Sequence, residues 1–228
     1  ILPLRIFRSR TVAGANAVQA LMNTAFIGFF FLGSLDLERV LGYGPMAIGL
    51  AFLPVAVVMA LFSIRFSAQL IARFGPGAML ATGQVTALGA LLIVGFGPAH
   101  ANYFLHLLAP MVMFGLGGGL SFPALTMIAM ADVAPGEAGL ASGLLNTTGQ
   151  VGGAFGLAVL ATVAGSRTTE LLRAGADATA ALAAGYHLAW LVGAGVVAVT
   201  LGVAALTLRS RRPVAIELGD LAVEGEAA

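Results

Sequence analysis

The chain contains no cysteine or lysine and few charged residues of any kind. Among its 228 residues it has no Cys, 11 basic residues, all of them Arg, and 10 acidic residues. Soluble proteins carry about 25% charged residues, whereas this chain has 9% together with 59% hydrophobic residues. So few charges cannot cover the surface of a soluble monomer, and we therefore infer a membrane protein. The absence of cysteine excludes disulfides, thiol catalysis and Cys-ligated metal sites.

Other function classes also find little support in the sequence. The formal net charge is +1, and no basic cluster occurs outside the two ends, so a surface for nucleic acid is not expected. Ser and Thr have no base beside them within the apolar stretches, and His and carboxylates do not cluster at metal-ligand spacing. No phosphate-binding loop is present. We therefore expect no enzymatic activity, no metal and no cofactor.

Long uncharged stretches predict an all-α membrane protein with six transmembrane helices. A helical span needs about 20 mostly apolar residues to cross a hydrocarbon core about 30 Å thick. We expect a cytoplasmic juxtamembrane segment at 1–10 before the bundle in the sequence and a cytoplasmic tail at 209–228 after it. The expected spans cover residues 11–35, 44–64, 76–97, 104–131, 138–164 and 185–208.

The arginines predict the orientation, because positively charged loops stay in the cytoplasm. One side of the predicted bundle collects eight Arg, and the other has only Arg39, Arg167 and Arg173. Both ends of the segment are therefore expected in the cytoplasm. The outer loop 166–184 is the longest loop, with room for a short surface helix.

Three amides are predicted to share one face of the first span. Asn16, Gln19 and Asn23 are spaced i, i+3 and i+7, and the same face continues outward to Phe30. A polar and aromatic stripe of this kind is typical of the wall of a substrate cavity. The alternative is that the amides only bond to neighbouring helices, which contributes about 1 kcal/mol each.

Span 138–164 contains small residues at four-residue spacing, which lets helices approach closely. The pairs are Gly139/Gly143, Gly149/Gly153 and Gly152/Gly156. Asn146 and Gln150 lie one turn apart on one face. Tight packing is the favoured interpretation. The alternative is a surface that slides against a partner and exposes both amides to a transport path.

Proline and glycine interrupt span 104–131. Pro110 and Pro123 flank a glycine run that includes Gly115 and Gly119. Proline removes a backbone hydrogen bond and glycine softens a helix, so this span is able to bend. Such interruptions are candidate hinges in transporters, although Pro is also common in passive spans.

Apart from Tyr, titratable side chains are scarce in the uncharged stretches. His106 and His187 stand near the expected outer ends of their spans beside Tyr and Trp residues, a pattern typical of interfacial anchors. Asp36 and Glu38 follow the first span with Arg39 and are expected in a solvated outer loop. We therefore expect no carboxylate embedded in the bundle, and a proton-binding site, where one is needed, in another part of the protein.

Several strings resemble one family in order and spacing. Residues 2–10 (LPLRIFRSR), 41–45 (LGYGP) and 49–54 (GLAFLP) resemble the seventh-helix region of the major facilitator superfamily and its connection to the eighth helix. Residues 115–123 (GLGGGLSFP), 139–146 (GLASGLLN) and 150–154 (QVGGA) resemble the fourteen-span drug:proton antiporter branch, the EmrB/QacA type. The resemblance covers about residues 2–212.

Two departures from the family pattern are visible. After the second span, Arg73, Phe74 and Gly75 match the family's gating motif, but Ala68 and Ala72 replace its Gly and Asp. An ion pair anchored at position 72 is therefore not available. Directly before Gln150, this chain has Gly149 where many family members carry Arg.

The resemblance implies a six-helix C-terminal bundle, one half of a rocker-switch transporter whose N-terminal half supplies the family's acidic proton-binding residues. The chain begins with Ile1 and not Met, so we expect a fragment of a longer protein. We predict the C-terminal half of a proton-coupled multidrug or metabolite exporter of the bacterial inner membrane, which works by alternating access on hydrophobic or amphipathic molecules. The alternatives are a carrier for a different solute and a non-transporting six-helix scaffold.

Overall fold

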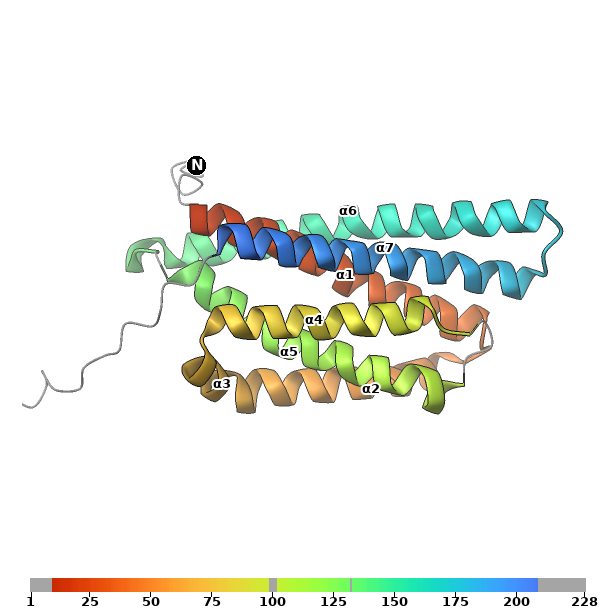
Figure 1. Cartoon of the computed structure of the whole chain (residues 1–228), viewed down its shortest axis with the longest axis horizontal. Coiled ribbons are helices and arrows are strands. Elements are labelled where there is room, and N and C mark those ends of the chain that lie inside the picture. Colours follow the sequence, from red (N-terminus) through yellow and green to blue (C-terminus); the bar gives the residue numbers. More distant parts are fainter. Residues whose placement is uncertain (1–9, 99–101, 132, 209–228) are drawn as a thin grey trace, which may run out of the picture.

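The structure is a computed structural model that describes residues 10–98, 102–131 and 133–208 (Figure 1). The expected segment 1–10, apart from Arg10, and the expected tail 209–228 lie outside these residues. In the described part of the chain all regular structure is helical. The helices are α1 (Arg10–Arg39), α2 (Pro45–Leu61), α3 (Ser67–Phe74), α4 (Pro76–Gly95), α5 (Leu108–Met130), α6 (Ala138–Arg173) and α7 (Ala178–Thr207), with π-helical turns η2 (Phe62–Phe66) and η3 (Tyr103–Leu107) and the 3-10 turn η4 (Pro135–Glu137).

Six of the described helical segments are long and apolar enough to cross a membrane, so the prediction of an all-α protein with six spans is confirmed. The second span is continuous from α2 through η2 to α3, and the fourth joins η3 to α5. The candidate spans are Thr11–Arg39, Pro45–Phe74, Pro76–Gly95, Tyr103–Met130, Ala138–Arg173 and Ala178–Thr207.

The helices extend beyond several expected span ends. α1 continues to Arg39 instead of ending near 35, α6 continues to Arg173 instead of 164, and α7 begins at Ala178 instead of 185. The long outer loop expected at 166–184 is therefore only a short turn, without a separate surface helix. Gly175, with a φ of 83°, follows the end of α6, and the Asp177 carboxylate accepts the N–H groups of Thr179 and Ala180 at 3.0 and 3.1 Å as the N-cap of α7. Charged residues therefore do not mark the ends of these helices.

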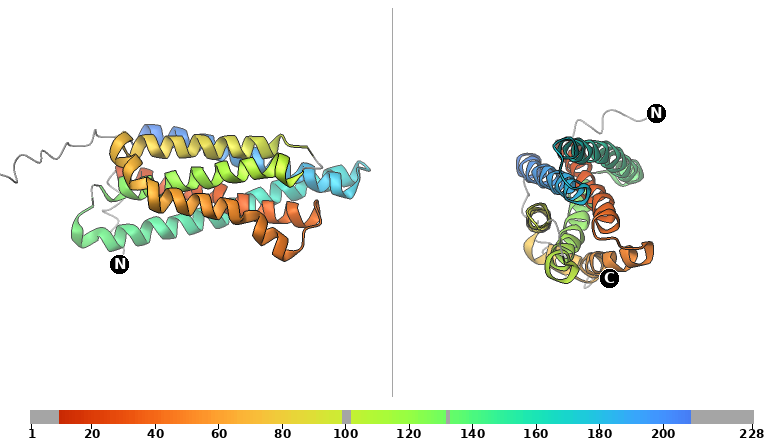
Figure 2. Two further views of the ribbon diagram at one scale, coloured as in Figure 1. Left: turned by 90° about the horizontal axis from the view of Figure 1, so that it is seen from below. Right: turned by 90° about the vertical axis from the view of Figure 1, so that its right-hand side faces the viewer.

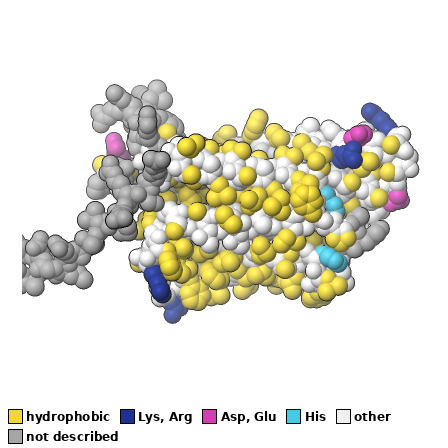
Figure 3. Space-filling view, viewed as in Figure 1, with side chains coloured by type: hydrophobic (Ala, Val, Ile, Leu, Met, Phe, Trp, Pro, Cys, Tyr) yellow, Lys and Arg dark blue, Asp and Glu magenta, His cyan; other side chains and the backbone are white. Residues whose placement is uncertain are grey.

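The spans run roughly parallel to one long axis (Figures 1 and 2). We call the end that holds the start of α1, the α3–α4 turn and the end of α7 the Arg10 end, and the opposite end the Arg39 end. In the space-filling view, charged side chains lie at the two ends and hydrophobic ones cover the length between them (Figure 3). This distribution is typical of a protein surrounded by lipid.

Glycines let the helices pack closely at two contacts. On α5, an added Cβ at Gly115 would lie 2.6 Å from the Val55 carbonyl oxygen of α2, and one at Gly119 would lie 2.9 Å from that of Met59. On α6, a Cβ at Gly152 would lie 2.5 Å from the Ala20 Cα of α1, and Gly153 faces Ile27 in the same contact.

Gly139 and Gly143 differ from the other glycines that were expected to pack. An added Cβ at either position would meet nothing within 4 Å in the described part of the chain. Both glycines lie on an exposed face of the first turns of α6, whereas Ala141 and Leu145 of the same turns are buried. These two glycines do not contribute to the helix packing seen here.

The predicted hinge helix is continuous. α5 runs from Leu108 to Met130 with Pro123 inside it, and Pro110 is buried just after the π-helical turn η3. π-helical turns are rare and are frequently found at functional sites. A hinge at Pro110 or Pro123 remains a prediction, because bending of α5 requires a second conformation.

Candidate substrate path

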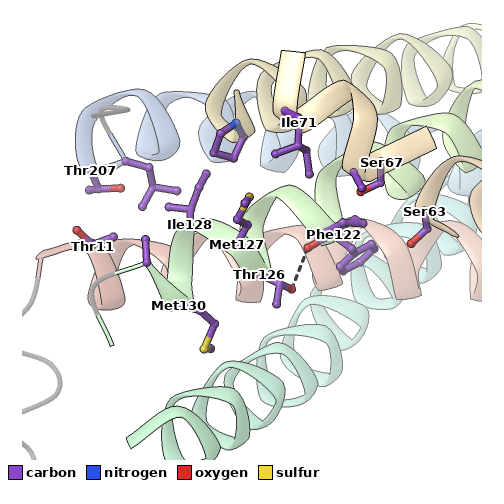
Figure 4. A pocket seen from close by; sticks show the side chains of 16 residues that line it. Thr11, Ser63, Ser67, Ile71, Phe122, Thr126, Met127, Ile128, Met130 and Thr207 are labelled. Carbon is purple, nitrogen blue, oxygen red and sulfur yellow. Dashed lines mark hydrogen bonds between the residues drawn. The ribbon is translucent and has the colours of Figure 1, made fainter. Parts of the chain in front are cut away.

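A cavity of about 1090 Å³ lies between the helices near the Arg10 end (Figure 4). Its walls come from the first turn of α1, the η2–α3 segment, the start of α4, the second half of α5 and the end of α7. None of the residues found in its wall is charged. The labelled lining residues are Thr11, Ser63, Ser67, Ile71, Phe122, Thr126, Met127, Ile128, Met130 and Thr207.

The cavity wall combines apolar surface with a few hydroxyl groups. The Thr126 hydroxyl donates to the Phe122 carbonyl at 3.0 Å, and the Thr207 hydroxyl donates to the Val203 carbonyl at 2.7 Å. Their protons are thus used within their own helices, and the oxygens remain able to accept. Met127 adds a flexible thioether, which adapts to ligands of different shape. A cavity of this size and chemistry suits a drug-sized molecule of low polarity.

An aromatic cluster leads from this cavity into the middle of the bundle. The Phe122 ring, which lines the cavity, meets the Phe26 ring of α1 edge-on at 5.3 Å between centroids. Phe26 lies 4.9 Å from Phe30, and Phe30 stacks on Phe52 of α2 at 5.0 Å. Phe29 stacks on Phe114 of α5 at 4.0 Å. The amide face of α1 led to Phe30 in the sequence, and the signal that could have found the whole cluster is the run of Phe26, Phe29 and Phe30 on α1.

The amide stripe of α1 does not line the cavity. Asn16 is buried, and its Nδ2 donates to the Val12 carbonyl of its own helix at 2.8 Å, while its Oδ1 has no partner among the described residues. Gln19 and Asn23 are half-buried and lie against Gly149 of α6. Gln19 and Asn23 therefore belong to the contact between α1 and α6, whereas Asn16 bonds within α1.

The two amides predicted on α6 stand beside this contact. Asn146 and Gln150 are exposed on either side of Gly149 in the sequence, and neither is part of the cavity wall. A Cβ at position 149 would meet Asn23 Nδ2 and would lie 3.0 Å from Gln19 Nε2. The space in which many family members place Arg is therefore occupied by the amides of α1. A larger residue at position 149 would have to displace these two amide groups.

The loop motif that the sequence places on the cytoplasmic side forms the turn between α3 and α4. Gly75 has a φ of 85°, a left-handed conformation that favours glycine, and it is the N-cap residue of α4. The Arg73 guanidinium lies 5.2 Å from the centre of the Phe74 ring. Gly75 thus shapes the turn and Arg73 contacts its exposed aromatic ring, without an acidic residue at position 72.

One sequence expectation is wrong at the Arg39 end of the bundle. Asp36 is not in a solvated loop, because α1 continues past it and the helical period turns it into the bundle, where its side chain is only 5% exposed. Glu38 and Arg39 are exposed as expected. Asp36 borders a small cavity together with His106, His187 and Trp190. The bundle therefore does hold a buried carboxyl group, and both histidines expected to be interfacial anchors lie beside it.

Sequence comparison assigns the chain to a family of membrane transporters. The profile of the Major Facilitator Superfamily matches residues 1–157, more than half of the chain. The chain belongs to the Major Facilitator Superfamily. The resemblance noted in the sequence is thereby confirmed, and the six-helix bundle with its apolar cavity is the described part of a Major Facilitator protein.

The relatives of this Major Facilitator chain are named for export and resistance. It is 37% identical to a cephamycin export protein of Amycolatopsis lactamdurans over 174 residues, 74% of this chain and 35% of the relative. It is 33% identical to a puromycin resistance protein of Streptomyces alboniger over 233 residues, 98% of this chain and 46% of the relative. A tetracenomycin C resistance and export protein of Streptomyces glaucescens is 33% identical over 75% of this chain. The chain spans less than half the length of these relatives.

Proposed function

We propose that this chain forms one half of a proton-driven exporter of hydrophobic or amphipathic small molecules in the bacterial inner membrane. The observation that carries the proposal is the uncharged cavity of about 1090 Å³ near the Arg10 end, in a Major Facilitator chain whose relatives are named exporters and resistance proteins. A neutral or weakly polar drug finds apolar contact there together with a few hydroxyl acceptors.

The proposed mechanism is alternating access. The second half of the transporter would face this bundle, and the two halves would rock around a path formed by both. Substrate would enter the cavity at the Arg10 end, which the arginines predict to be cytoplasmic, and would pass along the Phe122–Phe26–Phe30 cluster. Gln19, Asn23, Asn146 and Gln150 would supply hydrogen bonds where α1 and α6 meet the path.

The test uses the full reading frame that contains this chain, expressed in a drug-sensitive bacterium. In inside-out membrane vesicles we expect an imposed proton gradient to drive uptake of puromycin or of another amphipathic antibiotic. A protonophore should abolish this uptake. Uptake that is equal with and without the proton gradient would refute proton coupling. If no member of an amphipathic panel is taken up, the alternative of a carrier for a different solute takes its place.

A pair of amide variants tests the proposed path. Gln19→Leu removes an amide at the α1–α6 contact, and we expect roughly tenfold weaker uptake, the value of one lost hydrogen bond of about 1.4 kcal/mol. The matched control is Gln69→Leu, because Gln69 is an exposed amide on α3 outside the cavity wall. Equal uptake and equal substrate range in both variants would contradict a role for this face.

A further inference from the structure

The carboxyl group of Asp36 is buried without a partner of opposite charge. Its side chain is 5% exposed, and the ion pair Arg167–Glu170 is the single one in the described part of the chain. No described residue donates a hydrogen bond to the Asp36 carboxyl, although its backbone oxygen accepts from Val40 and Leu41. A buried carboxylate without compensation costs several kcal/mol, so the neutral acid is favoured until water or donors reach it.

Two small cavities border Asp36. One of about 10 Å³ is also lined by His106, His187 and Trp190, and its size is near the minimum for one water molecule. The other, also of about 10 Å³, is lined by apolar groups such as Phe29 and Phe52. A water molecule needs polar partners. The histidine side of Asp36 is therefore the side where water would bind.

Hydrogen-bond donors surround the polar cavity. Trp190 is 3% exposed, and its Nε1–H has no acceptor among the described residues, a rare situation for a buried donor. Nδ1 of His106 accepts the Asn102 N–H at 3.0 Å, which places the proton of the neutral ring on Nε2. The His187 ring lies 5.9 Å from Trp190, between ring centroids. One buried carboxyl group thus shares a cavity with the unpaired Trp190 N–H and with two histidine rings.

The other charged and titratable groups nearby do not neutralise Asp36. On its own helix, Glu38 and Arg39 are exposed, and on α7 the Tyr186 side chain lies within electrostatic range of all three of these α1 residues. Tyr103 of η3 donates its hydroxyl proton to the Ala51 carbonyl at 2.7 Å and faces Tyr43. α4 and the residues after it contribute Val94, Gly97 and Pro98 to the cavity wall. No cation among the described residues forms an ion pair with the carboxyl group.

We propose that Asp36, with His106, His187 and Trp190 around one bridging water, forms a proton-binding site near the Arg39 end. The bridging water gives one proton to the carboxylate and takes one from the protonated His187 ring, which bulk water reprotonates, so the neutral acid forms and no hydroxide is left; the reverse steps return the proton, with no change in oxidation state. Trp190 and His106 hold the water and stabilise the carboxylate when it forms, and His187 relays the proton. The use of this site in transport rests on the proposed function, whereas its existence rests on the buried cluster alone.

The first experiment detects the proton itself in the purified full-length protein. Infrared difference spectra over about pH 4 to 9 should show the C=O stretch of a protonated buried carboxyl group. Asp36→Asn should lose this band, Asp36→Glu should keep a shifted one, and the control Glu38→Gln should match the wild type. Trp190→Phe should move the midpoint upward by about one pH unit, because it removes a hydrogen bond to the charged form. Identical spectra for Asp36→Asn and the wild type would overturn the proposal.

The second experiment measures transport and separates the two proposals. In vesicles, Asp36→Asn should reduce gradient-driven puromycin uptake by roughly tenfold or more while it keeps exchange of substrate at equal pH, because only the proton-linked step is lost. Glu38→Gln should transport normally. Gradient-driven uptake that survives Asp36→Asn would overturn the role in coupling. If the wild type shows no gradient-driven uptake, the proposed function fails, and the infrared band alone decides whether Asp36 binds a proton.

Discussion

Substitution of Gly152 by alanine should separate α1 from α6. The added Cβ would lie 2.5 Å from Ala20 Cα and 2.7 Å from Ala20 O, and both atoms belong to the backbone. Ordinary carbon contacts are about 3.5–4.0 Å, so the two helices must move apart by about 1 Å. Overpacking of this kind costs about 1–3 kcal/mol. The same shift weakens the hydrogen bond from the Thr24 hydroxyl to the Gly152 carbonyl, now 2.9 Å long.

The matched control is Gly165→Ala on the same helix, where an added Cβ meets nothing within 4 Å of the described atoms. Both variants gain about 1 kcal/mol from the better helix propensity of alanine. We therefore expect the free energy of unfolding of Gly152→Ala to be about 1–3 kcal/mol lower than that of Gly165→Ala. Steric trapping of the full-length protein in bicelles measures this difference. A Gly152→Ala protein as stable as the control would refute the close contact between α1 and α6.

Two further substitutions test the core and the cavity. Ser121→Ala removes the hydroxyl that accepts from Gln84 Nε2 at 3.0 Å inside the α4–α5 contact, and it should lower the free energy of unfolding by about 1–3 kcal/mol. The control Ser166→Ala, at an exposed position, should change the free energy of unfolding by less than about 0.5 kcal/mol in the same assay. Ala68→Phe places a ring in the cavity wall and should reduce uptake of large substrates more than uptake of small ones. The control Ala60→Phe, on an exposed face outside the cavity, should leave uptake of both unchanged. An equal loss of uptake in both variants, or no loss in either, would count against the cavity as the substrate site.

The fold could be predicted from the sequence because the hydrocarbon core sets the length of each helical span and excludes charged side chains. All six spans could be placed by counting uncharged residues, without side-chain detail. The ends of the helices could not be placed in this way. Beyond the membrane, a helix such as α6 continues for as long as its backbone and caps allow, and the end near Arg173 depends on Gly175 and the Asp177 cap.

The candidate sites were less accessible because they depend on contacts between helices. The spacing of Gln19 and Asn23 correctly predicted that the two residues share one helix face. It did not predict that this face contacts Gly149 on α6. The cavity draws residues from five separate segments, and its hydroxyl and Met residues carry no distinctive spacing. Asp36 was assigned to a loop because charge was taken to mark the end of a helix. Its burial depends on α4, η3 and α7, which close around it only in three dimensions.

The two proposed sites lie at opposite ends of one helix, and α1 can therefore link them. Thr11 in its first turn lines the cavity, Phe26 and Phe29 stand in its middle, and Asp36 in its last turn borders the polar cavity. A helix is a rigid element, so a tilt that opens one end displaces the other. In the described conformation Asp36 is sealed from solvent while the large cavity is present at the Arg10 end. A sealed carboxyl favours its neutral form. Protonation of Asp36 should therefore favour this conformation, and loss of the proton should favour one in which the Arg39 end opens to water.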